Sequence, residues 1–515
     1  MKWAHFLHIY QPSDQHPGVL EKIVNESYRP LIRGFLKEPK TKITLNINAV
    51  LSEMLFEHGY RDVIEDIKIL VEMGRVELTG SAKFHAFLPF LPEDEVKRQI
   101  MLNHETNKRY FGDAFNPKGF FPPEMAYSPK VAEVAADLGY EWVILDEVSM
   151  TAKNGDLIND TIRKIGDLDI DVYFREKAPS NLIMGAFVRS AKSLEAAMKE
   201  RMSKNEYVIT AMDGETFGHH RPGLEKIFFE VMHSDSFDNV LISDLKTFYP
   251  KGESVMPLDS TWASNMKDVN AGNPFNLWFD KSNKIHEYEW ELATLAITAL
   301  HDSNYSDVKY PEMLEETIKW DEMTSDQKQG EEKKRQWLKA RDALDRALNS
   351  DPWWWASAKP WWSVEMIEKG MFALFSVITT IPDVSDEIKD KGEDLYKNIL
   401  FTAHEWQRNG IVDAMERNDS KERRIPLSKR FGASDHYKAL LSVLKIQEEK
   451  ASNNREYEQA IKWRDGQYKL ERDLDIYDAV HILDLFRNEG DFEKFNEILS
   501  EYKNKFREIS KGQPE

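Results

Sequence analysis

Residues 207–220 read YVITAMDGETFGHH, in which a short run of β-favouring residues passes directly into Asp213, Gly214 and Glu215. In a parallel α/β barrel the chemistry lies at the carboxyl ends of the strands, so the polar residues that end each strand are the first candidates for a site. Gly214 and Gly218 also permit close approach of the backbone around Asp213. The stretch therefore predicts a parallel strand that presents carboxylates to a cleft.

Six further β-favouring runs precede this one, and stretches with helical periodicity separate them. Such alternation predicts parallel strands joined by helical crossovers, and the number of runs favours a barrel of seven or eight strands over an open sheet. The predicted strands cover residues 2–8, 43–48, 76–79, 119–121, 142–145, 171–174 and 207–212.

The chain has 515 residues, more than one hydrophobic core usually supports, so we expect two parts. Residues 1–300 are expected to form the barrel, with a small insertion at 149–189, where the pattern becomes irregular. Residues 301–515 are expected to form an all-helical domain that contributes aromatic side chains to the cleft. The predicted helices there cover residues 331–348, 364–379, 386–409, 436–449, 455–470, 477–488 and 492–509.

The composition is that of a folded, acidic protein. The 69 Lys and Arg residues against 89 Asp and Glu residues give a formal net charge of -20, which disfavours nucleic acids and anionic membranes as partners but not a neutral polysaccharide. The absence of cysteine excludes disulfides, thiolate metal sites and cysteine nucleophiles. Because no apolar run suits a signal peptide or a membrane span, we expect a cytoplasmic protein, whose oligomeric state is not predicted.

A second carboxylate, Glu124, follows Pro122 and Pro123 at the end of another predicted strand. Cleavage of a glycosidic bond needs two carboxyl groups, one to attack the anomeric carbon and one to protonate the leaving oxygen, and retention of configuration places them about 5 to 5.5 Å apart. Only a fold that returns the chain brings Glu124 and Asp213 together, and a barrel does so. Acidic residues are common at the strand ends of barrels, so the pair by itself leaves the function open.

Four segments, in this order along the chain, resemble the motifs of glycoside hydrolase family 57. The first departs from the His-Gln-Pro of the family, since two residues separate His8 from Gln11, and the third has Phe where the family more often has Trp. The segment that begins at Asp213 is the most specific match. The four segments are HIYQP at 8–12, GRVE at 74–77, GFFPPE at 119–124 and DGETFGH at 213–219.

The resemblance implies a distorted (β/α)7-type barrel and a retaining mechanism on α-glucans, such as starch, glycogen or maltodextrin, with no metal or organic cofactor. It also implies that Glu124 is the nucleophile and Asp213 the general acid/base. The residues expected to bind substrate in these segments are His8, Gln11, Glu77, Glu215, His219 and His220.

Two aromatic segments extend this prediction. Residues 351–362 read DPWWWASAKPWW and hold five of the 14 tryptophans. Indole rings stack on the apolar faces of pyranose rings, so Trp355 and Trp361 are expected to reach the substrate, although tryptophan also suits a core between domains. Trp278 and His286, in a segment that resembles the last family motif loosely, are likewise expected either to line a sugar subsite or to pack the barrel against the helices.

Hydrolysis is the first prediction for the activity, because no long Gly/Tyr-rich insertion of the kind expected for a branching enzyme follows Trp262. A 4-α-glucanotransferase or a 1,4-α-glucan branching enzyme is the second. A non-catalytic glucan-binding protein is a further alternative. So is a metal-dependent hydrolase, whose ligands would come from His5, His8, His85, His219, His220 and Asp213, although no compact ligand spacing supports it.

Overall fold

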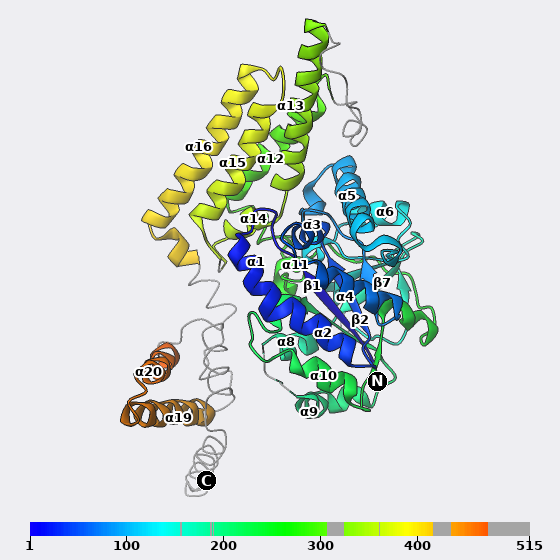
Figure 1. Ribbon diagram of the computed structural model, residues 1–515, viewed down its shortest axis with the longest axis vertical. Coiled ribbons are helices and arrows are strands. Elements are labelled where there is room, and N and C mark those ends of the chain that lie inside the picture. Colours follow the sequence, from blue (N-terminus) through cyan, green and yellow to red (C-terminus); the bar gives the residue numbers. More distant parts are fainter. Residues whose placement is uncertain are drawn as a thin grey trace, which may run out of the picture.

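A computed structural model describes residues 1–154, 157–185, 188, 190–305, 324–359, 361–415 and 434–471. Figure 1 shows a strand-containing part, which includes the N-terminus, beside a group of long helices. None of the helices in these ranges is long and apolar enough to cross a bilayer.

All seven predicted strands are present. They are β1 (Lys2–Ile9), β2 (Ile43–Ile47), β3 (Val76–Thr79), β4 (Gly119–Phe120), β5 (Trp142–Asp146), β7 (Asp171–Arg175) and β8 (Val208–Asp213). Two short strands, β6 (Arg163–Lys164) and β9 (Asp238–Val240), were not predicted, because runs of two and three residues carry no readable periodicity.

The strands form two sheets. One has the order β3-β2-β1-β8, with β9 also pairing with β1, and the other has the order β4-β5-β7-β6. Every pairing is parallel except that of β6 with β7. A parallel bridge between Gly80 and Phe120 connects the ends of β3 and β4. The α/β class with parallel strands is thus confirmed, whereas closure into a barrel stays a prediction, because no ladder joins β7 to β8 in the described ranges.

Helices follow most strands and bury their apolar faces against the sheets, as parallel strands require. Leu31, Ile32 and Phe35 of α2, for example, are buried in the same core as the β1 residues Leu7 and Ile9. The helices of this part are α1 (Pro17–Ile23), which continues through a π-helical turn (Val24–Tyr28) into α2 (Arg29–Lys37), α3 (Ala49–Glu57), α4 (Arg61–Glu72), α5 (Glu93–Phe111), α6 (Pro129–Asp137), α7 (Val148–Asn154), α8 (Lys177–Met184), α9 (Ala191–Met202), α10 (Lys226–His233) and α11 (Met266–Asn270).

α12 (Lys284–His301) leads into the helical part, and its amphipathic face packs on α15 and α16. The predicted helices from 331 to 470 are confirmed, and those at 477–488 and 492–509 lie outside the described residues. The further helices are α13 (Ser325–Ala347), α14 (Asp351–Trp355), α15 (Val364–Thr380), α16 (Asp386–Arg408), α19 (Ser434–Asn453) and α20 (Tyr457–Glu471).

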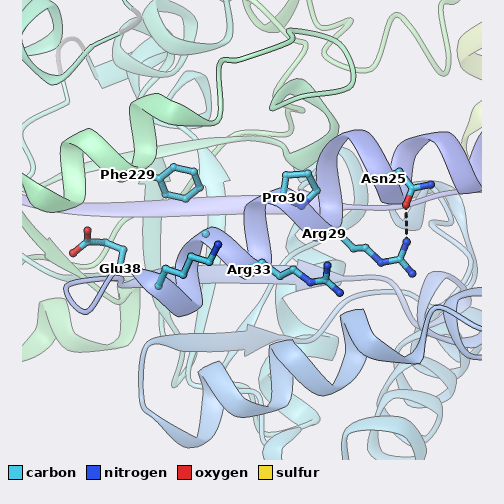
Figure 2. A pocket seen from close by; sticks show the side chains of 8 residues that line it. Asn25, Arg29, Pro30, Arg33, Glu38 and Phe229 are labelled. Carbon is cyan, nitrogen blue, oxygen red and sulfur yellow. Dashed lines mark hydrogen bonds between the residues drawn. The ribbon is translucent and has the colours of Figure 1, made fainter.

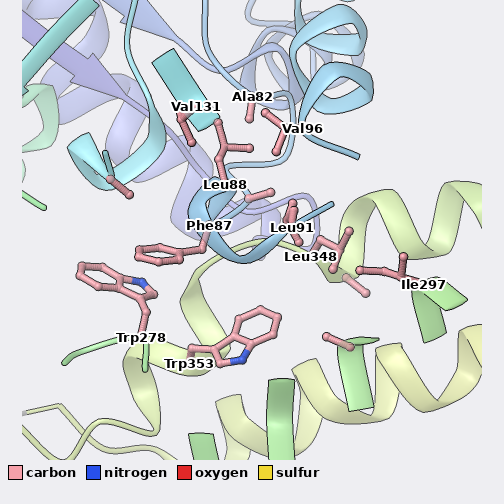
Figure 3. Close-up of a cluster of buried hydrophobic side chains, with 14 of the residues drawn as sticks. Ala82, Phe87, Leu88, Leu91, Val96, Val131, Trp278, Ile297, Leu348 and Trp353 are labelled. Atoms are coloured by element: carbon pink, nitrogen blue, oxygen red, sulfur yellow. The ribbon is translucent and has the colours of Figure 1, made fainter. Parts of the chain in front are cut away.

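One hydrophobic core joins the strand-containing part to the helices, as Figure 3 shows. Phe87, from the loop after β3, stacks on Trp278 with ring centroids 5.0 Å apart. Trp353 of α14 stacks in turn on Trp290 of α12 at 4.5 Å. Because this core is continuous, α14 is held firmly against the carboxyl ends of the strands.

Candidate active site

Glu124 lies in a short 3-10 turn (Pro123–Met125) directly after β4. Its backbone is in the left-handed region, with φ 62° and ψ 13°, which is unusual for a residue other than glycine. Two backbone hydrogen bonds hold this conformation: the Met125 N–H donates to the Pro122 carbonyl at 2.8 Å, and the Trp262 N–H donates to the Glu124 carbonyl at 3.0 Å. Backbone strain of this kind is typical of functional positions.

Three side chains meet the Glu124 carboxyl group, which is 16% exposed. The Trp262 indole N–H donates to Oε2 at 2.8 Å. The Ser350 hydroxyl donates to Oε1 over a longer distance of 3.5 Å, and His85 Nδ1 lies 3.8 Å from the same oxygen. Both oxygens therefore face hydrogen-bond donors, an arrangement that stabilises a carboxylate.

Asp213 is the last residue of β8 and lies in register with His8 of β1. Its side chain is half-buried and accepts no hydrogen bond from the part of the chain that the structure describes. Arg175, which ends β7, is the nearby positive charge that lowers the pKa of Asp213. Asp213 is thus a carboxyl group at a strand end that lacks the donors Glu124 has.

The two carboxyl groups are coupled. Burial, and after it the negative charge of Asp213, raise the pKa of Glu124 to about 8. Burial likewise raises the pKa of Asp213 to about 6, against the opposing effect of Arg175. Between these two values the pair holds one proton, and the higher pKa of Glu124 places that proton on Glu124 in the protein without substrate.

Glu215 is buried two residues beyond Asp213 and is hydrogen bonded through its Oε1 atom. It accepts from the Tyr28 hydroxyl, from the Gln11 side-chain amide at 3.3 Å and from the Tyr10 N–H at 3.4 Å. Burial and the charge of Asp213 raise the pKa of Glu215 to about 7. The structure therefore brings Gln11 and Glu215 together beside Asp213.

His8 stands in the same layer as Asp213 and is held by Asn46, whose Oδ1 lies 2.7 Å from His8 Nδ1. Its ring stacks on His85 with centroids 5.0 Å apart and contacts Phe121 in a tilted arrangement at 4.8 Å. Burial lowers the pKa of His8 to about 4, so the ring is neutral at pH 7. His5 lies in register with Thr210, three residues below this layer, where it contacts Asn239.

Glu77 is not brought to this layer. It lies in register with Thr44, two residues before the Asn46 pairing, and its Oε1 accepts from the Thr44 hydroxyl at 2.6 Å and the Ser243 N–H at 3.1 Å. Those contacts join β2 and β3 to the 3-10 turn Ile242–Thr247, near the amino ends of the strands. Glu77 thus holds a loop at the end of the sheet away from Asp213.

His219 and His220 follow Glu215 in a tight turn. His219 Nδ1 lies 2.6 Å from Glu26 Oε2, and the His220 N–H donates to the Glu215 carbonyl at 2.8 Å. The positive φ of Gly218, 102°, turns the chain so that it passes close to the carbonyl of Glu26. The two histidines therefore lie beside the carboxyl cluster, on the loop that Gly218 shapes.

Trp278 and His286 are fully buried and lie in the core between the two parts of the chain. His286 Nδ1 accepts from the Asp280 N–H at 3.0 Å, and its Nε2 lies 2.8 Å from the Trp353 carbonyl. Neither side chain is available to a ligand, so the packing alternative holds for both. Aromatic and histidine rings serve packing and ligand stacking equally well, which is why the sequence did not separate the two roles.

Trp355 and Trp361 are half-buried on the rim formed by α14 and the loop after it. Trp354 stacks on Trp361 at 4.8 Å and meets Trp355 edge-on at 5.0 Å. The first residue of the same helix, Asp351, accepts a hydrogen bond from the Tyr10 hydroxyl at 3.3 Å. The aromatic cluster is thus continuous with the carboxyl cluster.

Several residues of the site were not predicted from the sequence. Arg175 and Asp146 end β7 and β5 and form a buried ion pair at 2.7 Å, so the strand-end rule could have found them. Trp262, Ser350 and Asp351 follow no predicted strand, and no local pattern marks them. Arg175 also donates to the Ala211 carbonyl at 2.8 Å, which fixes its charge near Asp213.

Figure 2 shows a separate pocket on the outer face of the strand-containing part, between α2 and α10. Arg29 and Arg33, which line it, are both paired with Asp62, and Phe229 covers Gly34 at its edge. None of the predicted site residues lines this pocket. Among the described residues, no group of three His, Asp or Glu side chains is arranged to hold a metal ion.

Comparisons with known proteins agree with this geometry. Residues 4–254 match the family model for glycosyl hydrolase family 57. An α-amylase of Pyrococcus abyssi is 25% identical over 269 residues, which are 49% of this chain and 40% of the relative. A putative α-amylase of Methanocaldococcus jannaschii is 26% identical over 54% of this chain and 63% of its own length. The chain thus spans less than two thirds of these relatives.

Solved structures share the fold. A family 57-type branching enzyme of Pyrococcus horikoshii superposes with a TM-score of 0.58 at 14% identity, covering 78% of this chain and 94% of the other. A 4-α-glucanotransferase of Thermococcus litoralis gives a TM-score of 0.52 at 16% identity, covering 73% of this chain and 58% of the other. Residues 4–254, which contain all four ordered motifs, thus match glycosyl hydrolase family 57.

Proposed function

We propose that the chain is a retaining enzyme of α-glucans, with Glu124 as nucleophile and Asp213 as general acid/base. The observation that carries this proposal is the unequal hydrogen bonding of the two carboxyl groups. Glu124 faces donors at both oxygens. Asp213, which ends β8 in the same cluster, faces none among the residues that the structure describes. Donors favour the charged form of Glu124 that attacks, but burial outweighs them in the protein without substrate. The proposal therefore requires the shared proton to lie on Asp213 once the substrate is bound.

In the proposed first step Asp213 protonates the glycosidic oxygen while Glu124 attacks the anomeric carbon, which gives a covalent glycosyl-enzyme and releases the chain fragment. In the second step Asp213, now ionised, removes a proton from the incoming hydroxyl, which displaces Glu124. Loss of the proton from Asp213 in step one leaves it as the base for step two. Water as acceptor gives hydrolysis, and a glucan hydroxyl gives transfer.

The aromatic rim of Trp354, Trp355 and Trp361 supports a glucan as substrate, since half-buried indoles offer flat apolar faces to pyranose rings. Hydrolysis stays the first proposal, because the chain after Trp262 continues directly into α11 without a long insertion. Transfer or branching is the second. It is favoured by the burial of the site, which lengthens the life of the intermediate by excluding water.

We also infer the architecture around this site. The bridge from Gly80 to Phe120 and the hydrogen bond from the Glu176 N–H to the Ile209 carbonyl, at 2.9 Å, support closure of the two sheets into one distorted seven-stranded ring. Residues 1–300 would form this catalytic barrel, with an insertion at 149–189, and residues 301–515 the helical domain. The continuous core around Trp278 supports a fixed arrangement of the two.

The proposal is tested by incubating the protein with maltoheptaose and with amylose, with and without a chelator, and separating the products by chromatography. Shorter sugars alone indicate a hydrolase, and products longer than the substrate indicate a transferase. Glu124→Gln and Asp213→Asn should each abolish turnover while the far-UV circular dichroism is unchanged, whereas Glu133→Gln, on the exposed face of α6, should have no effect.

Three results would reject parts of this proposal. Activity that survives in Glu124→Gln rejects Glu124 as nucleophile. Loss of activity with the chelator rejects the metal-independent mechanism in favour of the metal-dependent alternative. No reaction of the wild type on either glucan rejects the substrate class and favours the non-catalytic, glucan-binding alternative, which a binding measurement on amylose then tests.

A further inference from the structure

The helical part sends a short segment into the site. The residue before Ser350, Asn349, forms an antiparallel bridge with Ala86, and the Ser350 N–H donates to the His85 carbonyl at 3.0 Å. His85 itself has a left-handed backbone, with φ 58°. Its strained conformation and the bridge together aim the His85 and Ser350 side chains at the same point, which is the Glu124 carboxyl group.

The three side chains form a line. His85 Nδ1 lies 3.0 Å from Ser350 Oγ, and Ser350 Oγ lies 3.5 Å from Glu124 Oε1. Both Ser350 and His85 are buried, at 0% and 2% exposure, so competition from bulk water is small. Hydrogen bonds in such a line strengthen one another, because each donor is polarised by the next acceptor.

The direction of the line follows from the second nitrogen of His85. Nε2 is buried and meets no hydrogen-bond partner among the described residues. A proton on Nε2 would be a buried donor without an acceptor, which is rarer and costlier than an unpaired acceptor. With the proton on Nδ1, His85 donates to Ser350 Oγ and Ser350 donates to Glu124.

His85 is held in place by ring stacking rather than by further polar contacts. Tyr10 stacks on the ring with centroids 4.2 Å apart, and His8 stacks on it at 5.0 Å. Burial lowers the pKa of His85 well below its ordinary value, so the ring stays neutral and acts as a fixed dipole. The titratable groups that face Glu124 are Asp213 from β8, Asp351 from α14, Tyr10 after β1 and His85 after β3.

We propose that His85 and Ser350 are positioning residues for Glu124, whose hydrogen-bonded line orients the carboxyl group and favours its ionised form for attack. This inference rests on the proposed function of Glu124 as nucleophile. Ser350 lies 226 residues beyond Glu124, in the helical part of the chain. The inference therefore gives the helical part a role in positioning the nucleophile. Neither residue needs to touch the substrate.

The test is a titration of Glu124 that requires no turnover. The Trp262 indole N–H is bonded to Glu124 Oε2, so its NMR signal in protein labelled with 15N-tryptophan should report the ionisation of Glu124. The signal is assigned with Trp262→Phe, and Glu124→Gln should remove its pH dependence. In Ser350→Ala the midpoint should rise by roughly 0.5 to 1 pH unit, since a donor that favours the carboxylate is lost.

Matched variants separate positioning from loss of structure. Ser52, in α3, has an equally buried hydroxyl that donates to Asn107 at 2.6 Å. Ser52→Ala removes that hydroxyl and should leave the midpoint of the Glu124 titration unchanged. His85→Ala should raise the midpoint as Ser350→Ala does. His85→Asn, which tolerates a left-handed backbone and keeps a donor near the position of Nδ1, should restore it.

A midpoint in Ser350→Ala equal to that of wild type and Ser52→Ala overturns the inference, as does a Trp262 signal that does not titrate in the wild type. A raised midpoint in Ser350→Ala and His85→Ala, with recovery in His85→Asn, supports it. These outcomes are read without a substrate. Failure of the proposed function, seen as absence of turnover on glucans, is therefore distinguished from failure of this inference.

Discussion

Substitution of Trp262 by Phe tests how the nucleophile is held. The change removes the indole N–H that donates to Glu124 Oε2 at 2.8 Å. It keeps an aromatic ring against Phe121 and His8, whose centroids lie 5.8 Å and 6.0 Å from that of Trp262. The variant therefore alters the polar contact more than the packing.

The magnitude follows from the charge on the acceptor. A hydrogen bond to a charged group contributes about 1.5 to 3 kcal/mol, so kcat/KM should fall roughly 10- to 150-fold if the bond orients Glu124 in the transition state. Loss of the donor also raises the pKa of Glu124, already at about 8 through burial, so the reactive form with Glu124 ionised becomes rarer. The basic limb of the pH profile, near pH 8, should accordingly move to higher pH.

The assay is steady-state kinetics on maltoheptaose across pH, with Trp290→Phe as the matched control. Trp290 donates an equivalent indole bond to the Trp278 carbonyl at 2.9 Å, in the core of the helical part. A loss of activity in Trp262→Phe no larger than that in Trp290→Phe would refute the reasoning. An unchanged basic limb would refute it as well.

Three further predictions concern pH and stability. The profile of kcat/KM should be bell-shaped with apparent midpoints near pH 6 and pH 8, because activity needs one proton on the pair of Asp213 and Glu124; a profile flat across this range would contradict the coupling. Glu289 is fully buried in α12 with both carboxyl oxygens unpartnered among the described residues, and burial raises its pKa well above 4.5. The free energy of unfolding is therefore highest below pH 4.5, where Glu289 is protonated in both the folded and the unfolded state, and it falls as the pH rises towards the folded pKa. Glu289→Met removes this dependence, so its stabilisation relative to wild type should grow by about 1.4 kcal/mol per pH unit above 4.5. Thermal unfolding between pH 4.5 and 8 measures this difference. Gly218→Ala places Cβ 1.9 Å from the Glu26 carbonyl oxygen at φ 102°, and should destabilise by about 1 to 3 kcal/mol more than Gly223→Ala, where φ is also positive but no atom lies within 4 Å; equal melting temperatures would contradict the clash.

The strands and the two carboxylates were predictable because their signals are local. Six of the seven predicted strands are mostly buried runs of four to eight residues, and Asp213 directly ends one of them, whereas β4 has only two residues. Glu124 is marked by the prolines before it. β6 and β9 were missed because they are too short to show a period.

The partners of Glu124 were not predictable in this way. Ser350 reaches it only because the core around Trp353 holds α14 against the strand ends, a tertiary contact with no local sequence signal. For Trp278 and His286, the sequence left open whether the side chains bind a sugar or pack in the core. Their residue types suit a sugar subsite, but full burial gives them to the core.

The central claim, that Glu124 forms the glycosyl-enzyme, is tested most directly by trapping that species in Asp213→Asn with α-maltosyl fluoride. Fluoride leaves without protonation, so the first step proceeds, while the second step lacks its base and the intermediate accumulates. Peptide mass spectrometry should then find one maltosyl group on Glu124, and none after Glu124→Gln is added to the variant. A label on Glu215 or Asp351 instead, or continued turnover of the doubly substituted protein, would contradict the claim.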